Sequence, residues 1–135
     1  MKKTLVITIF LFVALFVMQE ITKAQSLYFC EGVTKDGQPE NSSSTFTIPS
    51  DGGYFYFLVR LPYAVGCYNV DYVLYKIDSR GKATYSTTIA HDNLETNWTW
   101  FWKKVTFYDS GYYRIDVVDC SSTTLASNFV TVKYQ

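Results

Sequence analysis

Histidine is nearly absent from this sequence, which contains one, His91, in 135 residues. A single histidine excludes the His-rich spacings of zinc sites and leaves little material for general acid–base catalysis. Asp92 follows His91, but neighbouring strand residues point to opposite faces, so the pair indicates turn composition rather than a catalytic pair. The sequence also lacks a Gly-x-Ser-x-Gly elbow and a glycine-rich phosphate loop. We therefore expect a protein that is not an enzyme and holds no metal or cofactor.

Clustered positive charge is also missing. The chain has 12 basic and 12 acidic residues, and its longest basic run is Lys103-Lys104. Nucleic acids and anionic membrane surfaces bind clustered lysine and arginine, so neither is an expected partner. Asp36, Glu40 and Asn41 offer oxygen ligands for calcium, but their spacing matches no calcium-binding loop and favours an ordinary solvated loop.

The longest apolar run lies at the N-terminus and is too short for a membrane-spanning helix, which needs about 20 residues. Lys2-Lys3 precede an apolar segment, Leu5–Met18, which is followed by the small-residue cleavage site Thr22-Lys23-Ala24. This order is typical of a secretory signal peptide. We expect residues 1–24 to be that peptide in a bacterial protein. Residues 25–135 are then secreted or periplasmic, with no membrane span after cleavage.

Helix-favouring runs are scarce, whereas the chain has 12 tyrosines, 10 phenylalanines and 3 tryptophans. Aromatic residues favour half-buried pleated surfaces, and strand-like runs alternate here with turn signals at regular spacing. We predict one all-β domain, an antiparallel β-sandwich of about seven or eight strands. The expected strands are Ser26–Glu31, Thr45–Ile48, Tyr54–Leu61, Val70–Ile77, Ala83–Ala90, Trp98–Phe107, Tyr113–Val117 and Asn128–Tyr134.

A short motif resembles a known family. Asp109-Ser110-Gly111-Tyr112-Tyr113 matches the Asp-x-Gly-x-Tyr pattern of immunoglobulin-like domains. The segment from Trp98 to Ile115 resembles the E strand, corner and F strand of that family, and its continuation is similar to bacterial secreted immunoglobulin-like or PKD-like modules. The resemblance implies that Asp109, Gly111 and Tyr113 form the structural corner, with the tyrosine hydroxyl bonded to nearby backbone.

Three cysteines in an exported chain predict one disulfide and one remaining thiol, and the sequence alone leaves all three pairings open. The immunoglobulin-like strand assignment places Cys67 and Cys120 at the same end of the sandwich, which favours a Cys67–Cys120 disulfide. Cys30 is then either buried as a small apolar residue or joins two chains into an oligomer. Ile115 occupies the place of the second cysteine of antibody-type domains, so their inter-sheet disulfide is not expected.

The three tryptophans, Trp98, Trp100 and Trp102, alternate along one predicted strand and therefore share a face. An exposed row would form a platform that stacks on sugars, whereas the immunoglobulin-like alignment implies core positions for Trp100 and Trp102. We expect the core arrangement, with Trp98 partly exposed at the strand end. Lys103-Lys104 interrupts the alternation and indicates a β-bulge.

Tyrosines on neighbouring strands are the other candidates for a binding surface, because each ring buries a large area while its hydroxyl stays free. An equally good alternative is that these tyrosines only pack around the core. The candidate binding face consists of Tyr54, Tyr56, Tyr72, Tyr85 and Trp98. We expect a secreted, non-catalytic binding or assembly module that contacts an extracellular or cell-surface protein. The alternative is a carbohydrate-binding domain that uses aromatic stacking.

Overall fold

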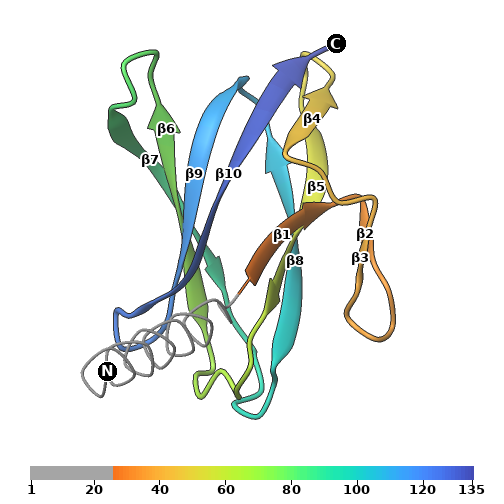
Figure 1. Cartoon of the computed structure of the whole chain (residues 1–135), viewed down its shortest axis with the longest axis vertical. Helices are drawn as coiled ribbons and strands as arrows, with labels where there is room; N and C mark the ends of the chain where they lie inside the picture. Colours follow the sequence, from red (N-terminus) through yellow and green to blue (C-terminus); the bar gives the residue numbers. More distant parts are fainter. Residues whose placement is uncertain (1–25) are drawn as a thin grey trace, which may run out of the picture.

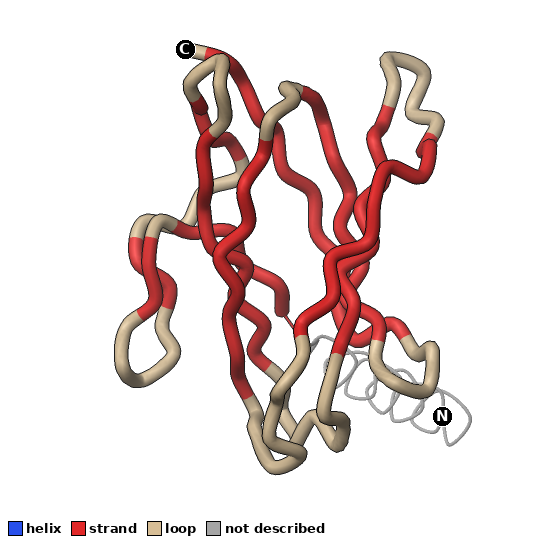
Figure 2. Tube along the Cα trace, turned by 180° about the vertical axis from the view of Figure 1, so that it is seen from behind, coloured by secondary structure: helices blue, strands red, loops and turns tan. Residues whose placement is uncertain are grey.

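A computed structural model describes residues 26–135 as two β-sheets packed face to face, with a small hairpin beside them (Figure 1). Every regular element in this range is a strand, so no helix there could cross a membrane (Figure 2). The strands are β1 (Ser26–Cys30), β2 (Gly32–Val33), β3 (Pro39–Glu40), β4 (Thr45–Ile48), β5 (Gly53–Arg60), β6 (Val70–Ile77), β7 (Ala83–His91), β8 (Trp100–Phe107), β9 (Gly111–Val118) and β10 (Thr124–Tyr134). The predicted all-β class is confirmed. The predicted signal peptide, residues 1–24, lies outside the described residues.

The strand order places β7 and β8 at open edges. One sheet has the order β4-β10-β9-β6-β7, the other has the order β1-β5-β8, and β2 pairs with β3. All pairs are antiparallel except β4 with β10, which run parallel. A β-sandwich is therefore confirmed, and β4 is the exception to the predicted antiparallel pairing.

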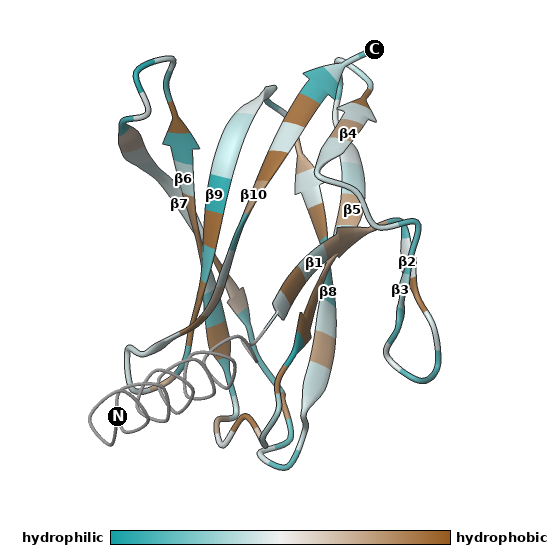
Figure 3. Ribbon diagram, viewed as in Figure 1, coloured by the Kyte–Doolittle hydropathy of each residue, from teal (hydrophilic) through white to brown (hydrophobic). Residues whose placement is uncertain are grey.

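The core lies between the two sheets and follows from the period-two pattern of the strands. Along β9, Tyr113, Ile115 and Val117 are buried, while the residues between them reach the outer face. Hydrophobic and hydrophilic bands alternate along β9 and β10 (Figure 3). Phenylalanines of the three-stranded sheet fill the centre, where Phe57 meets Phe29 edge-on at a centroid distance of 5.2 Å.

A tyrosine corner joins β8 to β9. The Tyr113 hydroxyl donates a hydrogen bond to the backbone carbonyl of Asp109 at 3.0 Å. Gly111 lies where a side chain would collide with neighbours, since a Cβ there would sit 2.6 Å from the Lys76 side chain and 3.2 Å from the Tyr113 ring. The motif Asp-x-Gly-x-Tyr thus has a physical basis: the glycine makes room for the ring, and the ring hydroxyl ties down the turn.

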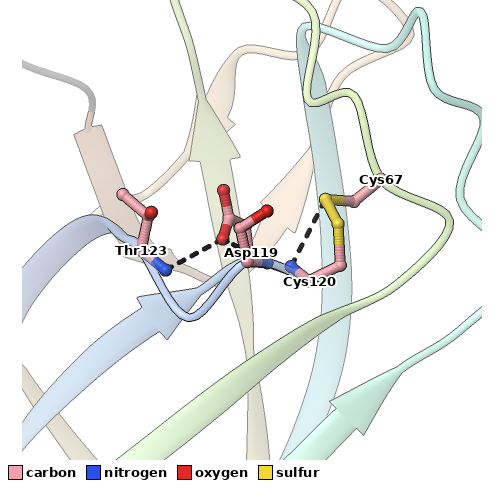
Figure 4. Close-up of a disulfide and its surroundings, with 5 residues drawn as sticks. Cys67, Asp119, Cys120 and Thr123 are labelled. Atoms are coloured by element: carbon pink, nitrogen blue, oxygen red, sulfur yellow. Dashed lines mark hydrogen bonds between the residues drawn. A yellow bond between two sulfur atoms is a disulfide. The ribbon is translucent and has the colours of Figure 1, made fainter.

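The disulfide joins Cys67, in the loop before β6, to Cys120, in the turn after β9, with Cα atoms 5.9 Å apart (Figure 4). The backbone N–H of Cys120 donates to the Cys67 sulfur at 3.3 Å. The Asp119 carboxylate holds the same turn by accepting backbone N–H groups of Ser121 and Thr123 at 2.8 and 2.9 Å. The predicted Cys67–Cys120 pairing is confirmed, and such bonds are typical of proteins outside the reducing cytoplasm.

Cys30 is the free cysteine among the described residues, and it is fully buried. Its thiol donates to the Tyr56 carbonyl at 3.8 Å, and burial raises its pKa. A bond between two chains through Cys30 would require the surrounding structure to open first.

The expected core position of Trp100 and Trp102 is wrong. β8 pairs with β5 in unbroken register, from Gly53 opposite Phe107 to Arg60 opposite Trp100, so the predicted bulge at Lys103-Lys104 is absent. With strict alternation, the buried side chains of β8 are Phe101, Val105 and Phe107. The two tryptophans therefore lie on the outer face of the three-stranded sheet.

Lys103 interrupts the apolar pattern on the inward face of β8. It occupies an inward position of β8 between Phe101 and Val105, yet it is only half-buried. Because β8 is an edge strand, a long lysine side chain can run along the core and bring its ammonium group to water at the open side.

Candidate functional site

An open groove of about 540 Å³ follows the free edge of β8, next to the end of β7. Its lining comes from both faces of β8: Phe101 points inward, whereas Trp100 and Trp102 point outward. The groove therefore wraps around the edge strand. The full lining consists of His91, Asn97, Trp98, Thr99, Trp100, Phe101 and Trp102. We call this the tryptophan groove.

The walls of the tryptophan groove are aromatic and partly open to solvent. Trp98 is 39% exposed and Trp102 is 46% exposed, while Trp100 is half-buried. Asn97 and Thr99 add an amide and a hydroxyl to this lining. A concave, mostly apolar site with a few polar groups is the usual form of a small-molecule or glycan site, where the polar groups fix the ligand's orientation.

The one ionisable side chain in the lining, His91, is held by the core. Its Nδ1 lies 3.0 Å from the Tyr72 hydroxyl, and its ring meets Phe101 edge-on at 5.7 Å. Burial raises the pKa of Tyr72, so the phenol keeps its proton. The direction of this hydrogen bond follows the tautomer of His91: the phenol donates to Nδ1 when the imidazole proton is on Nε2, and accepts when that proton is on Nδ1.

Burial, with a smaller contribution from the Lys103 charge, lowers the pKa of His91 from 6.5 to about 4, and Asp92 opposes this only in part. Between pH 4 and 6.5 the unfolded chain thus binds more protons than the folded one, so stability rises with pH across this window. We expect His91 to account for a loss of about 2 kcal/mol in the free energy of unfolding between pH 7 and 4.5.

Urea denaturation of the wild type and of His91→Gln at both pH values checks this expectation. The glutamine variant cannot titrate, so its stability should fall less steeply, although its carboxylates titrate as before. Equal losses in the two proteins would show that His91 does not govern this part of the pH dependence.

A line of aromatic rings continues from the groove across the outer face of the three-stranded sheet. Trp102 meets Tyr56 edge-on at 5.3 Å, and Tyr56 meets Tyr54 at 6.2 Å. The Lys104 ammonium lies over the Tyr54 ring, 3.8 Å from its centroid. Two of the predicted binding residues, Tyr54 and Tyr56, therefore adjoin the tryptophans through Trp102.

The predicted binding face does not exist as one surface. Tyr72 faces the core and is fully buried, so its assignment to an exposed face is wrong. Its alternating position on β6 places it between the sheets, where it contacts Phe57 at 5.4 Å. Tyr85 is 59% exposed but belongs to β7 in the other sheet, away from Tyr54 and Tyr56. Trp98 lines the tryptophan groove.

Tyr85 belongs instead to a row of side chains that crosses the outer face of the five-stranded sheet. In this row Tyr75 lies opposite Tyr85 on β7 and opposite Arg114 on β9, and Arg114 lies opposite Phe129 on β10. The Arg114 guanidinium covers the Tyr75 ring at 4.4 Å and forms an ion pair with Asp116 at 3.2 Å. This row was not predicted, because its members meet only through the pairing of distant strands.

Among residues 26–135, no three His, Cys, Asp or Glu side chains gather as metal ligands would. Of the three candidate calcium ligands, Asn41 donates an amide N–H to the Glu31 carboxylate at 3.0 Å.

No protein-family model matches the sequence, and no curated protein is detectably similar to it. Among solved structures, the chain is similar to an immunoglobulin-like protein from Pseudomonas aeruginosa, with a TM-score of 0.49 and 13% sequence identity. The match covers 80% of this chain and 92% of that one. The order of the two sheets and the Tyr113 corner identify the fold as an immunoglobulin-like β-sandwich.

Proposed function

We propose that the chain is a non-catalytic binding module that acts outside the cytoplasm and binds carbohydrate in the tryptophan groove. The observation that carries this proposal is that Trp98, Trp100 and Trp102 line one open groove, with Trp100 and Trp102 on the outer face of β8. Indole faces offer large, rigid apolar surfaces that can cover the C–H faces of sugar rings, while the Asn97 amide and the Thr99 hydroxyl can bond to sugar hydroxyls.

The chemistry of the groove favours binding over catalysis. Glycoside hydrolysis needs a pair of carboxyl groups flanking the bond, and the groove lining contains no aspartate or glutamate. His91 is neutral above about pH 5, and its Nδ1 is occupied by the Tyr72 hydroxyl.

A second candidate function is assembly with a protein partner through the outer face of the five-stranded sheet. The row of Tyr85, Tyr75, Arg114 and Phe129 supports it, with Tyr112 stacked on Phe129 at 5.6 Å. Tyrosine and arginine are enriched where protein surfaces meet. The two candidates use opposite sheets, so single substitutions separate them.

Trp102→Ala tests the carbohydrate proposal. We expect the wild type to bind a soluble polysaccharide in affinity electrophoresis and calorimetry, with a change in tryptophan fluorescence. Loss of one stacking face should weaken binding about tenfold or more. Tyr85→Ala, which removes an exposed aromatic ring from the other sheet, should bind as the wild type does. A Tyr85 variant that loses affinity while the Trp102 variant keeps it would contradict the proposal.

A further inference from the structure

The β2–β3 hairpin is packed on the outer face of the three-stranded sheet, beside the tryptophan groove. Figure 1 shows the hairpin on the side of β5 and β8 that faces away from the other sheet. Leu58 has an outward position on β5, between Tyr28 and Trp102, and yet is fully buried. The Arg60 guanidinium donates a hydrogen bond to the carbonyl of Gly37 at the hairpin tip. The hairpin is therefore part of the protein's packing and not a free arm.

Gly37 lies directly against the Trp100 indole. A Cβ added to Gly37 would sit 2.4, 2.6 and 2.8 Å from three carbon atoms of the fused ring system of Trp100. These distances are too short for any side chain, so the glycine backbone forms the surface on which the indole rests. Gly37 also has φ +76°, a conformation that favours glycine. Two independent requirements thus select glycine at this position.

The hairpin tip is a fixed turn. The Gly37 N–H donates to the Thr34 carbonyl at 3.0 Å, and the Gln38 N–H donates to the Thr34 hydroxyl at 3.0 Å. The Thr34 N–H in turn donates to the Gln38 carbonyl at 2.9 Å. With the Arg60 bond, these contacts hold the Gly37 backbone in place and so fix the position of the Trp100 ring.

We infer that the hairpin tip is a positioning element of the binding site, which fixes Trp100 so that the indoles along β8 present a rigid row to an uncharged, linear polysaccharide. This inference rests on the proposed function. The ligand is a linear chain because residues at alternate strand positions, such as Trp100 and Trp102, follow one another along the strand at intervals of roughly 6.4–6.8 Å and so form a line. A rigid row loses less entropy on binding than mobile rings.

The charge of the site indicates that the ligand is neutral. Above about pH 5 no lining residue is charged, because His91 is the one that titrates and its pKa is about 4. The two cations that share the outer face near the row are engaged: Arg60 binds the Gly37 carbonyl, and Lys104 covers the Tyr54 ring. Lys103 lies outside the lining at the free edge of β8, close enough to His91 for its charge to act on that imidazole. The lining itself thus offers a uronic-acid polymer no cation.

The experiment compares the wild type with Gly37→Ala on soluble neutral polysaccharides (a mixed-linkage β-glucan, a xylan and a galactomannan) and on alginate. Gly81→Ala is the matched control, because Gly81 has φ +82° and no atom within 4 Å of the added Cβ. Both variants carry the same backbone strain, but only Gly37→Ala displaces Trp100. We expect at least a tenfold loss of affinity for Gly37→Ala, an altered near-ultraviolet circular dichroism signal from tryptophan, and neither change for Gly81→Ala.

Two further variants keep the test decisive. In a Trp100→Ala background, adding Gly37→Ala should cost no further affinity, because the ring that it displaces is gone. If Gly37→Ala does not fold, Arg60→Met removes the guanidinium bond to the tip, and we expect a several-fold weaker affinity from it.

The outcomes separate the two claims. If the wild type binds none of the polysaccharides, both the proposed function and this inference are contradicted. Binding by the wild type with unchanged affinity in Gly37→Ala overturns the inference alone. Preference for alginate that disappears with added salt contradicts the assignment of a neutral ligand and leaves the tryptophan groove as the site.

Discussion

Removing the Cys67–Cys120 disulfide is expected to lower the free energy of unfolding by about 4 kcal/mol. The bridge joins residues separated by 53 positions, and a link of this span restricts the unfolded chain strongly. It also holds the loop before β6 to the turn after β9, where the Asp119 carboxylate organises the backbone. A small domain has a stability of only about 5–15 kcal/mol, so this loss is a large fraction of the total.

A Cys67→Ala/Cys120→Ala double variant tests this expectation by urea denaturation and by thermal unfolding. For a domain of about 110 residues, 1 kcal/mol corresponds to about 4–5 °C, so Tm should fall by about 15–20 °C. Cys30→Ala is the control, because it removes a buried sulfur and leaves the bridge intact. We expect it to cost about 1 kcal/mol. Equal losses in the two variants would mean that the bridge adds little beyond its packing.

Phe57→Ala is the single substitution from which we expect the greatest loss of stability, about 3–5 kcal/mol. The ring is fully buried at the centre of β5. It contacts Phe29 at 5.2 Å, Tyr72 at 5.4 Å and Phe55 at 5.9 Å, so it joins both sheets through one aromatic cluster. Truncation would remove these contacts and leave a cavity that rigid neighbouring rings cannot fill.

Tyr56→Ala is the matched control for this measurement. Tyr56 is the preceding residue on the same strand and also carries an aromatic ring, but its side chain lies on the outer face and is only half-buried. We expect a loss of about 1 kcal/mol or less from it, measured by urea denaturation. A comparable loss in the two variants would show that the sandwich does not depend on a core between its sheets.

Much of the fold is predictable from the sequence because its determinants are local. The alternation of Tyr113, Ile115 and Val117 specifies which face of β9 is buried, and the motif ending at Tyr113 specifies the corner. The strand order implied by that motif brings Cys67 and Cys120 together, as the structure confirms.

The candidate site could not be predicted in the same way, because it depends on which face of β8 meets the core. Alternation puts the tryptophans on one face and Phe101, Val105 and Phe107 on the other, and both sets are apolar enough to be buried. Lys103 lies on the face that is in fact the inner one, which made that face look exposed. Only the pairing of β8 with β5 and its place at the sheet edge decide the question.

The hairpin is a second feature that local patterns do not reveal. Residues 35–41 are polar and contain glycine and proline, and this composition indicates a loop. The two strands of the hairpin, β2 before this segment and β3 inside it, have only two residues each. What orders them is contact with Trp100 and Arg60, which are more than 20 positions away along the chain.

The buried thiol of Cys30 makes opening of the structure near the hairpin measurable by chemical labelling. Its sulfur lies near the backbone amides of Gly32 and Glu40, at the base of the hairpin, and has no exposed surface. A thiol reagent can therefore reach it only when the structure around it opens, and separation of this base from the sheet is one such opening. When the open structure recloses faster than the reagent reacts with the thiol, the labelling rate reports the equilibrium between the closed and open hairpin. Amide hydrogen exchange reports the same kind of equilibrium for backbone groups. The chain thus contains its own chemical reporter for opening at the base of the hairpin.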